Sequence, residues 1–126
     1  MANVSELVGK TLTSIENIND HTILFITADG DQYKLTHIQD CCEDVYISDI
    51  EGDLQSLVGN PILVAEEVDS GDAGPLGDYV ESYTWTFYKF ATIKGHVDIR
   101  WYGSSNGYYS ESVDFIKSDD YMWRYT

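Results

Sequence analysis

The chain has 126 residues, and its seven Lys and Arg stand against 22 Asp and Glu, which sets a formal net charge of −15 at pH 7. A hydrophobic content of 43% excludes a disordered chain, and no apolar run is long enough to span a membrane. We expect residues 1–126 to form a single soluble domain, because a chain of this length buries enough apolar surface to fold without metals or disulfides.

The chain begins with MANVSELVGK, which lacks a basic stretch followed by an apolar one. No secretory signal is indicated, so the cytoplasm is the expected location. Two β-branched and aromatic runs within residues 22–37 then flank Asp29-Gly30, a dipeptide that favours a two-residue type I′ turn. Pairing across this turn sets Thr22 opposite His37, so His37 is expected to end a core-facing row.

Residues 37–45, HIQDCCEDV, gather a histidine, two cysteines and three acids at the predicted end of this strand. Adjacent cysteines have Cα atoms about 3.8 Å apart, below the usual range for a disulfide, so two reduced thiols are expected. Three interpretations stay open: a ligand or metal site, a nucleophilic cysteine with a histidine base, and polar groups that cap a turn. The residues of this candidate site are His37, Asp40, Cys41, Cys42 and Glu43.

Zinc is the metal that this cluster suggests. A structural zinc site uses about four ligands, commonly in two separated pairs, and the sequence lacks that signature. His37 and one cysteine would have to recruit His96 from elsewhere in the chain. We therefore expect no cofactor, with zinc as the alternative.

The middle of the chain is predicted to hold a strand, one short helix and a loop. The strand is EDVYISDIEG, at residues 43–52. In DLQSLVGNPILVAEEV, Asp53 can cap a short helical turn that ends at Gly59, and a strand follows Pro61. Residues 69–78, DSGDAGPLGD, hold three glycines, a proline and three aspartates, which predicts a mobile acidic loop.

A second hairpin is predicted in YTWTFYKFATIKGHVDIRWYG, with Lys94-Gly95 as its two-residue turn. This register pairs Phe90 with Ile99 and Tyr88 with Trp101, and alternation places these side chains on one buried face together with Val97. The opposite face is mixed and solvated, and it carries Lys89, Asp98, Arg100 and Tyr102.

A third strand, YYSESVDFIK, is expected to extend the same core face through Val113 and Phe115. The predicted elements together indicate a mainly β fold. We expect seven or eight antiparallel strands in a sandwich or open barrel, with one short helix.

The negative charge is concentrated in the middle of the chain, where no Lys or Arg occurs between Lys34 and Lys89. Such a field repels nucleic acid phosphates and membrane surfaces, and it attracts basic protein surfaces most strongly at low salt. The alternative is that acidity only keeps the protein soluble. The residues predicted to contact a basic partner are Asp49, Glu51, Asp53, Glu66, Glu67, Asp69 and Asp72.

The segments HIQDCCEDVYISDIEGDLQSLVG, PILVAEE and YTWTFYKFATIKGHVDIRWYGSSNGYYSESVDF together resemble a family of small proteins of tailed bacteriophages and prophages. The resemblance extends from about Thr22 to Phe115. Its marker is the set His37, Gln39, Asp40, Cys41, Cys42 and Glu43. The resemblance implies that the protein is encoded by a phage or prophage, and it assigns no activity to these residues. Small acidic phage proteins often inhibit host enzymes or host defence, so the resemblance implies inhibition of a host protein.

Two functional hypotheses follow. In the first, the acidic residues imitate DNA and dock, without catalysis, on the basic nucleic-acid-binding surface of a host protein, with an affinity that falls steeply with salt. In the second, the strand end near His37, Cys41 and Cys42 is a sequestering pocket or an active site for a small molecule or a metal. A ligand retained through purification, and lost when His37 or Cys41 is replaced, would support the second.

Overall fold

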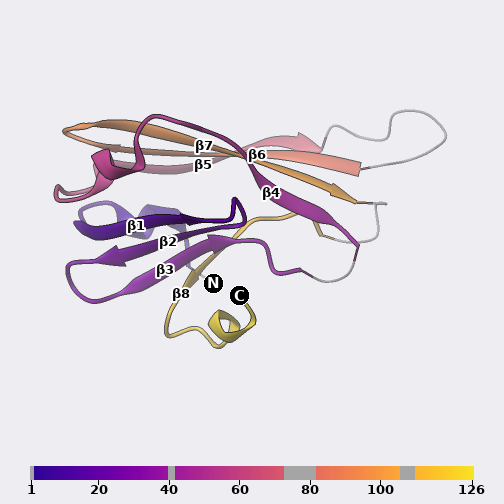
Figure 1. The fold of residues 1–126 in the computed structure, drawn as a ribbon, viewed down its shortest axis with the longest axis horizontal. Coiled ribbons are helices and arrows are strands. Elements are labelled where there is room, and N and C mark those ends of the chain that lie inside the picture. Colours follow the sequence, from indigo (N-terminus) through magenta and orange to yellow (C-terminus); the bar gives the residue numbers. More distant parts are fainter. Residues whose placement is uncertain (1, 40–41, 73–81, 106–109) are drawn as a thin grey trace.

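Two antiparallel sheets lie face to face in the computed structural model, which describes residues 2–39, 42–72, 82–105 and 110–126 (Figure 1). The first sheet has the strand order β1-β2-β3-β8 and the second has the order β4-β7-β6-β5. The strands are β1 (Leu12–Ile18), β2 (Thr22–Thr27), β3 (Gln32–Thr36), β4 (Asp44–Glu51), β5 (Val64–Asp72), β6 (Ser82–Thr92), β7 (Gly95–Ser105) and β8 (Asp114–Lys117). Within these ranges the predicted class is confirmed, as a sandwich and not as a closed barrel.

The predicted short helix is a single 3₁₀ turn, η2 (Leu54–Leu57), and its N-cap is Asp53 as expected. The Asp53 carboxylate accepts the Gln55 N–H at 2.9 Å, which satisfies a donor that the turn leaves unpaired. Two further 3₁₀ turns were not predicted, η1 (Val4–Leu7) and η3 (Tyr121–Tyr125). No helix in the described ranges is both long and apolar enough to cross a membrane.

The β2–β3 turn differs from the predicted type I′ turn, and the predicted register is wrong by one residue. Thr22 lies opposite Thr36, not His37. The loop contains three residues, because Thr27 N–H donates to the Asp31 carbonyl at 2.9 Å and Gly30 takes the left-handed conformation at φ +89°. Left-handed residues in this pattern are typical of a three-residue hairpin loop. His37 therefore lies just beyond the end of β3.

The β6–β7 hairpin has the predicted faces in a different register. Phe90 lies opposite Val97 and Tyr88 opposite Ile99, because the turn residues are Ile93 and Lys94 and not Lys94 and Gly95. A shift of two residues leaves every side chain on its predicted side, since side chains alternate with a period of two. The apolar set is buried as expected: Tyr88, Phe90, Val97, Ile99 and Trp101.

The last strand does not extend the sheet of β6 and β7 as predicted. β8 crosses to the first sheet and pairs with β3, where Phe115 lies opposite Leu35. Phe115 then stacks on Tyr33 with ring centroids 5.0 Å apart, while Phe25 reaches Phe90 of the other sheet at 5.5 Å. Aromatic rings from both sheets therefore pack against one another in the core between the sheets.

The predicted mobile loop at residues 69–78 is partly strand. β5 extends to Asp72 and pairs with β6, with an irregular register between Asp69 and Asp72. Residues 73–78 lie outside the described ranges.

Candidate functional site

The side of the β4-β7-β6-β5 sheet that faces away from the first sheet is the main candidate site, and we call it the outer face. Cross-strand pairing puts Arg100 between Asp49 and Phe87, and Asp98 between Glu51 and Lys89. Phe87, Lys89, Asp98 and Arg100 each lie between two buried residues along their strands, and Asp49 and Glu51 flank the half-buried Ile50, so alternation turns these side chains outward. The outer face comprises Tyr46, Asp49, Glu51, Glu66, Tyr83, Trp85, Phe87, Lys89, Asp98, Arg100 and Tyr102.

A β-bulge in β4 brings Asp49 to this face. Ile47 is buried and lies opposite Trp101, and in a regular strand a residue two positions later would also point inward. The register shifts between Ile47 and Asp49, so that Asp49 lies opposite Arg100 instead. Bulges commonly redirect a side chain near a functional site.

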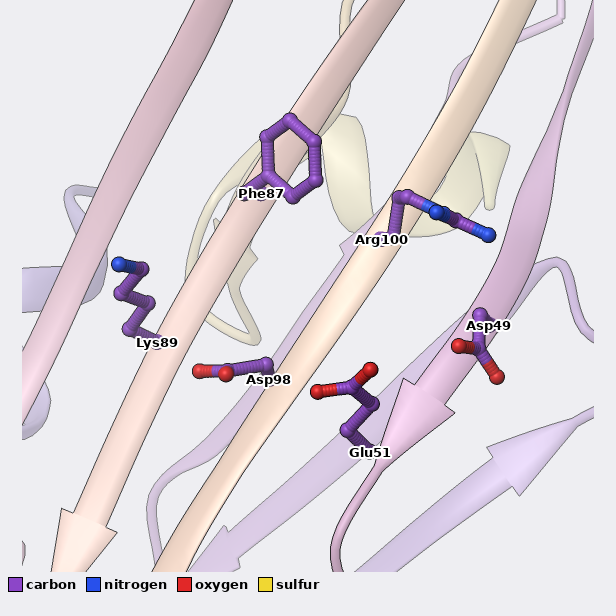
Figure 2. A pocket seen from close by; sticks show the side chains of 6 residues that line it. All are labelled: Asp49, Glu51, Phe87, Lys89, Asp98 and Arg100. Carbon is purple, nitrogen blue, oxygen red and sulfur yellow. The ribbon is translucent and has the colours of Figure 1, made fainter.

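The centre of the outer face is a shallow hollow of about 260 Å³. Figure 2 shows Glu51 and Asp98 next to each other, with the guanidinium of Arg100 extending toward β4. The volume is below the ~300 Å³ at which small-molecule pockets begin, so it suits a single protruding side chain better than a whole ligand. The lining residues are Asp49, Glu51, Phe87, Lys89, Asp98 and Arg100.

The charges of the hollow are unequal, with three carboxylates against two cations. Within the described part of the chain, neither Lys89 nor Arg100 forms an ion pair within 4.0 Å. Glu51 and Asp98 lie directly opposite each other across β4 and β7, an arrangement that is destabilising for like charges. The hollow therefore favours an additional positive group.

Aromatic rings continue the outer face beside the hollow. The Tyr102 ring lies 4.8 Å from Trp85, 5.7 Å from Tyr46 and 6.5 Å from Tyr83, measured between centroids. We call these four residues the Tyr102 cluster. Tyr46 is 38% exposed although it is a large aromatic residue. Amphipathic rings on an open sheet face are typical of binding surfaces.

The residues predicted to contact a partner are only partly brought together. Glu66 lies opposite Lys89 and so joins Asp49 and Glu51 on the outer face. Glu67 lies opposite the inward-pointing Tyr88, on the other side of the sheet. Asp53 is occupied as the cap of η2. Asp69 and Asp72 belong to β5, but their side chains are not described.

In the second predicted site the structure describes His37, Cys42 and Glu43, and both ring nitrogens of His37 have partners. His37 Nδ1 lies 2.7 Å from the Ser112 carbonyl oxygen, and His37 Nε2 lies 2.8 Å from Glu43 Oε1. Gln39 Nε2 donates to the Glu43 carbonyl at 2.7 Å, which closes the same turn. Because both ring nitrogens are engaged, His37 has no nitrogen left to act as a base or a metal ligand in this arrangement.

The expectation for the cysteines is not met. Cys42 is disulfide-bonded, so the expectation of two reduced thiols is wrong for Cys42. Asp40 and Cys41 lie outside the described residues. Among the residues that are described, no three His, Cys, Asp or Glu side chains are grouped to hold a metal ion. His96 lies at the start of β7, roughly 25 Å along that strand from Ser104, which pairs with Asp44 beside Glu43.

A buried carboxyl that sequence reasoning missed lies close to this turn in the fold. Glu111 accepts hydrogen bonds from Thr84 Oγ1 at 2.8 Å and from Ser105 Oγ at 2.5 Å. The Glu111 backbone and Cβ also lie against Gly103, where an added Cβ would approach both to 2.9 Å. Glu111 stands between two serines in the run SESVD, where no apolar alternation marks it as buried, so its burial could only come from the packing.

Asp114 is another acid whose surroundings the sequence did not indicate. Burial raises the pKa of the Asp114 carboxyl above its ordinary value, against the opposing effects of the nearby His37 and of the Ile38 backbone N–H. His37 is thus flanked by carboxyls from two segments, Glu43 before β4 and Asp114 in β8.

Fold and site together define a two-sheet antiparallel β-sandwich with an open aromatic and acidic face. The chain belongs to the family described as Domain of unknown function (DUF7448), which matches residues 5–115. No curated protein matches the chain, and no solved structure matches it.

Proposed function

We propose that this protein is a non-catalytic binding protein that docks on a basic surface of another protein through its outer face. The observation that carries the proposal is the position of the Tyr102 cluster next to the three carboxylates of the hollow, on one open sheet face. The aromatic rings supply contact area, and the carboxylates favour a partner whose surface is positively charged.

The residue types on this face support the proposal. Tyr, Trp and Arg are the residues in which interface binding energy concentrates, and Tyr102, Trp85 and Arg100 lie together here. The carboxylates Asp49, Glu51, Glu66 and Asp98 exceed the cations Lys89 and Arg100. Complementary charge steers association and rejects acidic partners.

The expected partner is a protein with a strongly basic patch, because the formal net charge of −15 opposes binding to nucleic acid itself. Basic patches of this kind are the electrostatic footprint of nucleic-acid-binding surfaces. The resemblance to small phage proteins makes a protein of an infected host the expected source, and occupation of its nucleic-acid site the expected mode of inhibition.

Affinity capture followed by titration tests the proposal. The full chain is immobilised and exposed to nuclease-treated bacterial lysate, and each captured protein is purified and titrated against the wild-type chain at low and high salt. We expect the affinity to fall steeply as salt rises, since charge pairs between surfaces are screened. An affinity that is independent of salt contradicts the proposal.

Two triple variants with the same net charge distinguish the contribution of the outer face to binding from the contribution of the overall negative charge. Asp49→Asn, Glu51→Gln and Asp98→Asn together remove the three negative charges of the hollow, whereas Glu16→Gln, Asp29→Asn and Asp119→Asn remove three exposed negative charges elsewhere. We expect the first triple variant to lose binding and the second to keep it. Equal losses would mean that only net charge matters, and the outer face would not be the binding site.

A further inference from the structure

The outer face ends at β5, the last strand of its sheet, and three exposed residues follow one another along that strand. β5 pairs with β6 so that Glu66 lies opposite Lys89 and Val68 opposite Phe87, and both partners belong to the outer face. Val64 lies two residues before Glu66 and points to the same side, since side chains alternate along a strand. We call Val64, Glu66 and Val68 the β5 strip.

We propose that the β5 strip binds an extended segment of the basic partner, in which a lysine or arginine stands between two apolar residues at alternate positions. The cation lies against Glu66, and the two apolar residues lie against Val64 and Val68. This inference rests on the proposed function, because it specifies which part of the partner contacts the edge of the outer face.

Exposed apolar side chains are concentrated at this strip. In the described ranges eight large hydrophobic side chains are exposed, and three of them lie within six consecutive residues: Leu63 at 60%, Val64 at 37% and Val68 at 43%. The core side of the strand is covered by the chain itself, because Ala65 is buried in the same cluster as Val4 of η1. Clustered apolar exposure, unlike that of single scattered residues, marks a binding surface.

The charge of Glu66 selects a cationic residue in the segment. Glu66 is the outer end of a row that crosses all four strands and continues through Lys89, Asp98 and Glu51. Glu66 is exposed, and among the described residues it forms no ion pair within 4.0 Å. A cation on a neighbouring segment would face it as an opposite charge, which stabilises cross-strand pairing.

A second copy of the chain fits the strip poorly. A two-fold axis at Glu66 would pair two β5 strands antiparallel and place the two Glu66 carboxylates directly opposite each other. Each copy also has a formal net charge of −15, so the copies repel each other at long range. The segment therefore belongs to a different, basic protein.

The spacing of the strip requires an extended segment. Val64 and Val68 are four residues apart on a strand, which corresponds to about 13 Å along its axis. Four residues of a helix advance by only about 6 Å, so a helix cannot follow all three residues of the strip. Alternate side chains of an extended segment have the matching spacing, and edge strands commonly accept such segments.

A synthetic peptide tests the strip with the purified full chain. The probe is Thr-Val-Thr-Lys-Thr-Val-Thr with blocked ends, and a second peptide carries Glu in place of Lys. Each is titrated to millimolar concentration into the ¹⁵N-labelled chain while the backbone amide shifts are followed by NMR. We expect the Lys peptide to shift residues 64–68 and 87–91 and to bind at least about threefold more tightly than the Glu peptide, since attraction to Glu66 is replaced by repulsion.

Charge reversal on the chain provides the matched variants. Glu66→Lys should prefer the Glu peptide. Glu16→Lys makes the same change at an exposed residue of β1, the edge strand of the first sheet, and should keep the preference of the wild type. The proposal is overturned if the Lys peptide causes no shifts at β5, if Glu66→Lys still prefers the Lys peptide, or if Glu16→Lys reverses its preference as well.

Failure of the strip can be told apart from failure of the proposed function. If a captured basic protein loses affinity for the triple variant of the hollow but not for Glu66→Lys, the outer face is the binding site and the β5 strip is not part of it. If the Lys peptide binds as expected and no basic protein binds the chain, only the proposed function is contradicted.

Discussion

Arg100 places its guanidinium over the indole ring of Trp85, 5.1 Å from the ring centroid, although three carboxylates lie on the same face of the sheet. The cation is thus engaged with a ring and not paired with Asp49, its cross-strand neighbour, within the part of the chain that is described. The cation thus lies over Trp85, and among the residues that the structure describes no ion pair within 4.0 Å involves the acids of the hollow.

Loss of the Arg100 guanidinium should cost a small amount of stability. We expect Arg100→Met to lower the free energy of unfolding by about 0.5–1 kcal/mol, because an exposed cation over an indole ring contributes about that much and methionine keeps most of the apolar stem. Lys89→Met, which removes a cation of the same face without a ring beneath it, is the control and should change stability less in urea titrations. An equal change in both would argue against a cation–π contribution.

Tyr102 is the centre of the aromatic cluster and should dominate binding. We expect Tyr102→Ala to weaken affinity for the basic target by about tenfold or more, since buried interface tyrosines commonly contribute at least 1–2 kcal/mol. Tyr121→Ala removes a ring that is 71% exposed in η3, away from this cluster, and serves as the control in the same titration. If Tyr121→Ala had the larger effect, the binding surface would lie near η3.

The Glu111 carboxylate should be important for folding. We expect Glu111→Gln to lower the free energy of unfolding by about 1–3 kcal/mol, because an amide group cannot accept both the Thr84 and Ser105 hydroxyl protons at these positions. Glu51→Gln makes the same chemical change on the exposed hollow and should stay within about 0.5 kcal/mol of the wild type. Chemical denaturation of the three proteins side by side measures the difference.

Gly103 is required by close packing and not by its backbone angle. A methyl group there would come within 2.9 Å of the Glu111 backbone oxygen and 3.3 Å of Val45, so we expect Gly103→Ala to destabilise the fold by about 1–3 kcal/mol. Gly30→Asn meets no neighbouring atoms and places at a left-handed position the side chain that tolerates it best, so we expect a smaller loss, of at most about 1 kcal/mol. Thermal unfolding of both variants measures the difference. If Gly103→Ala were the less destabilised variant, the contact with Glu111 would relax easily and the prediction would be wrong.

Asp114 should make stability depend on pH in a definite direction. Since burial raises its pKa in the folded protein, the stability linked to its protonated form is complete at low pH and is lost as the pH rises through the raised value. We expect Asp114→Asn, which can still accept the Ile38 N–H, to be more stable than the wild type at neutral pH. The advantage should vanish below the ordinary value of 3.8, as urea midpoints at several pH values will measure. A variant that is less stable at neutral pH would contradict the assignment.

The amino-acid sequence by itself determined the class of the fold and the sides of its central hairpin. Tyr88, Phe90, Val97 and Ile99 alternate with polar residues, and a period of two assigns them to the core even when the predicted register is wrong by two positions. The cap at Asp53 was equally predictable, because it needs only the N–H groups of the next few residues.

Only the tertiary structure decided the rest, because the contacts concerned join distant parts of the chain. The bulge that turns Asp49 outward depends on pairing with β7, and the partner of β8 depends on which sheet edge is free to accept it. His37 meets a carbonyl 75 residues away, and Glu111 meets a hydroxyl 27 residues away. Local periodicity contains no information about such pairs, since their stability comes from burial and hydrogen bonding that exist once both sheets have packed.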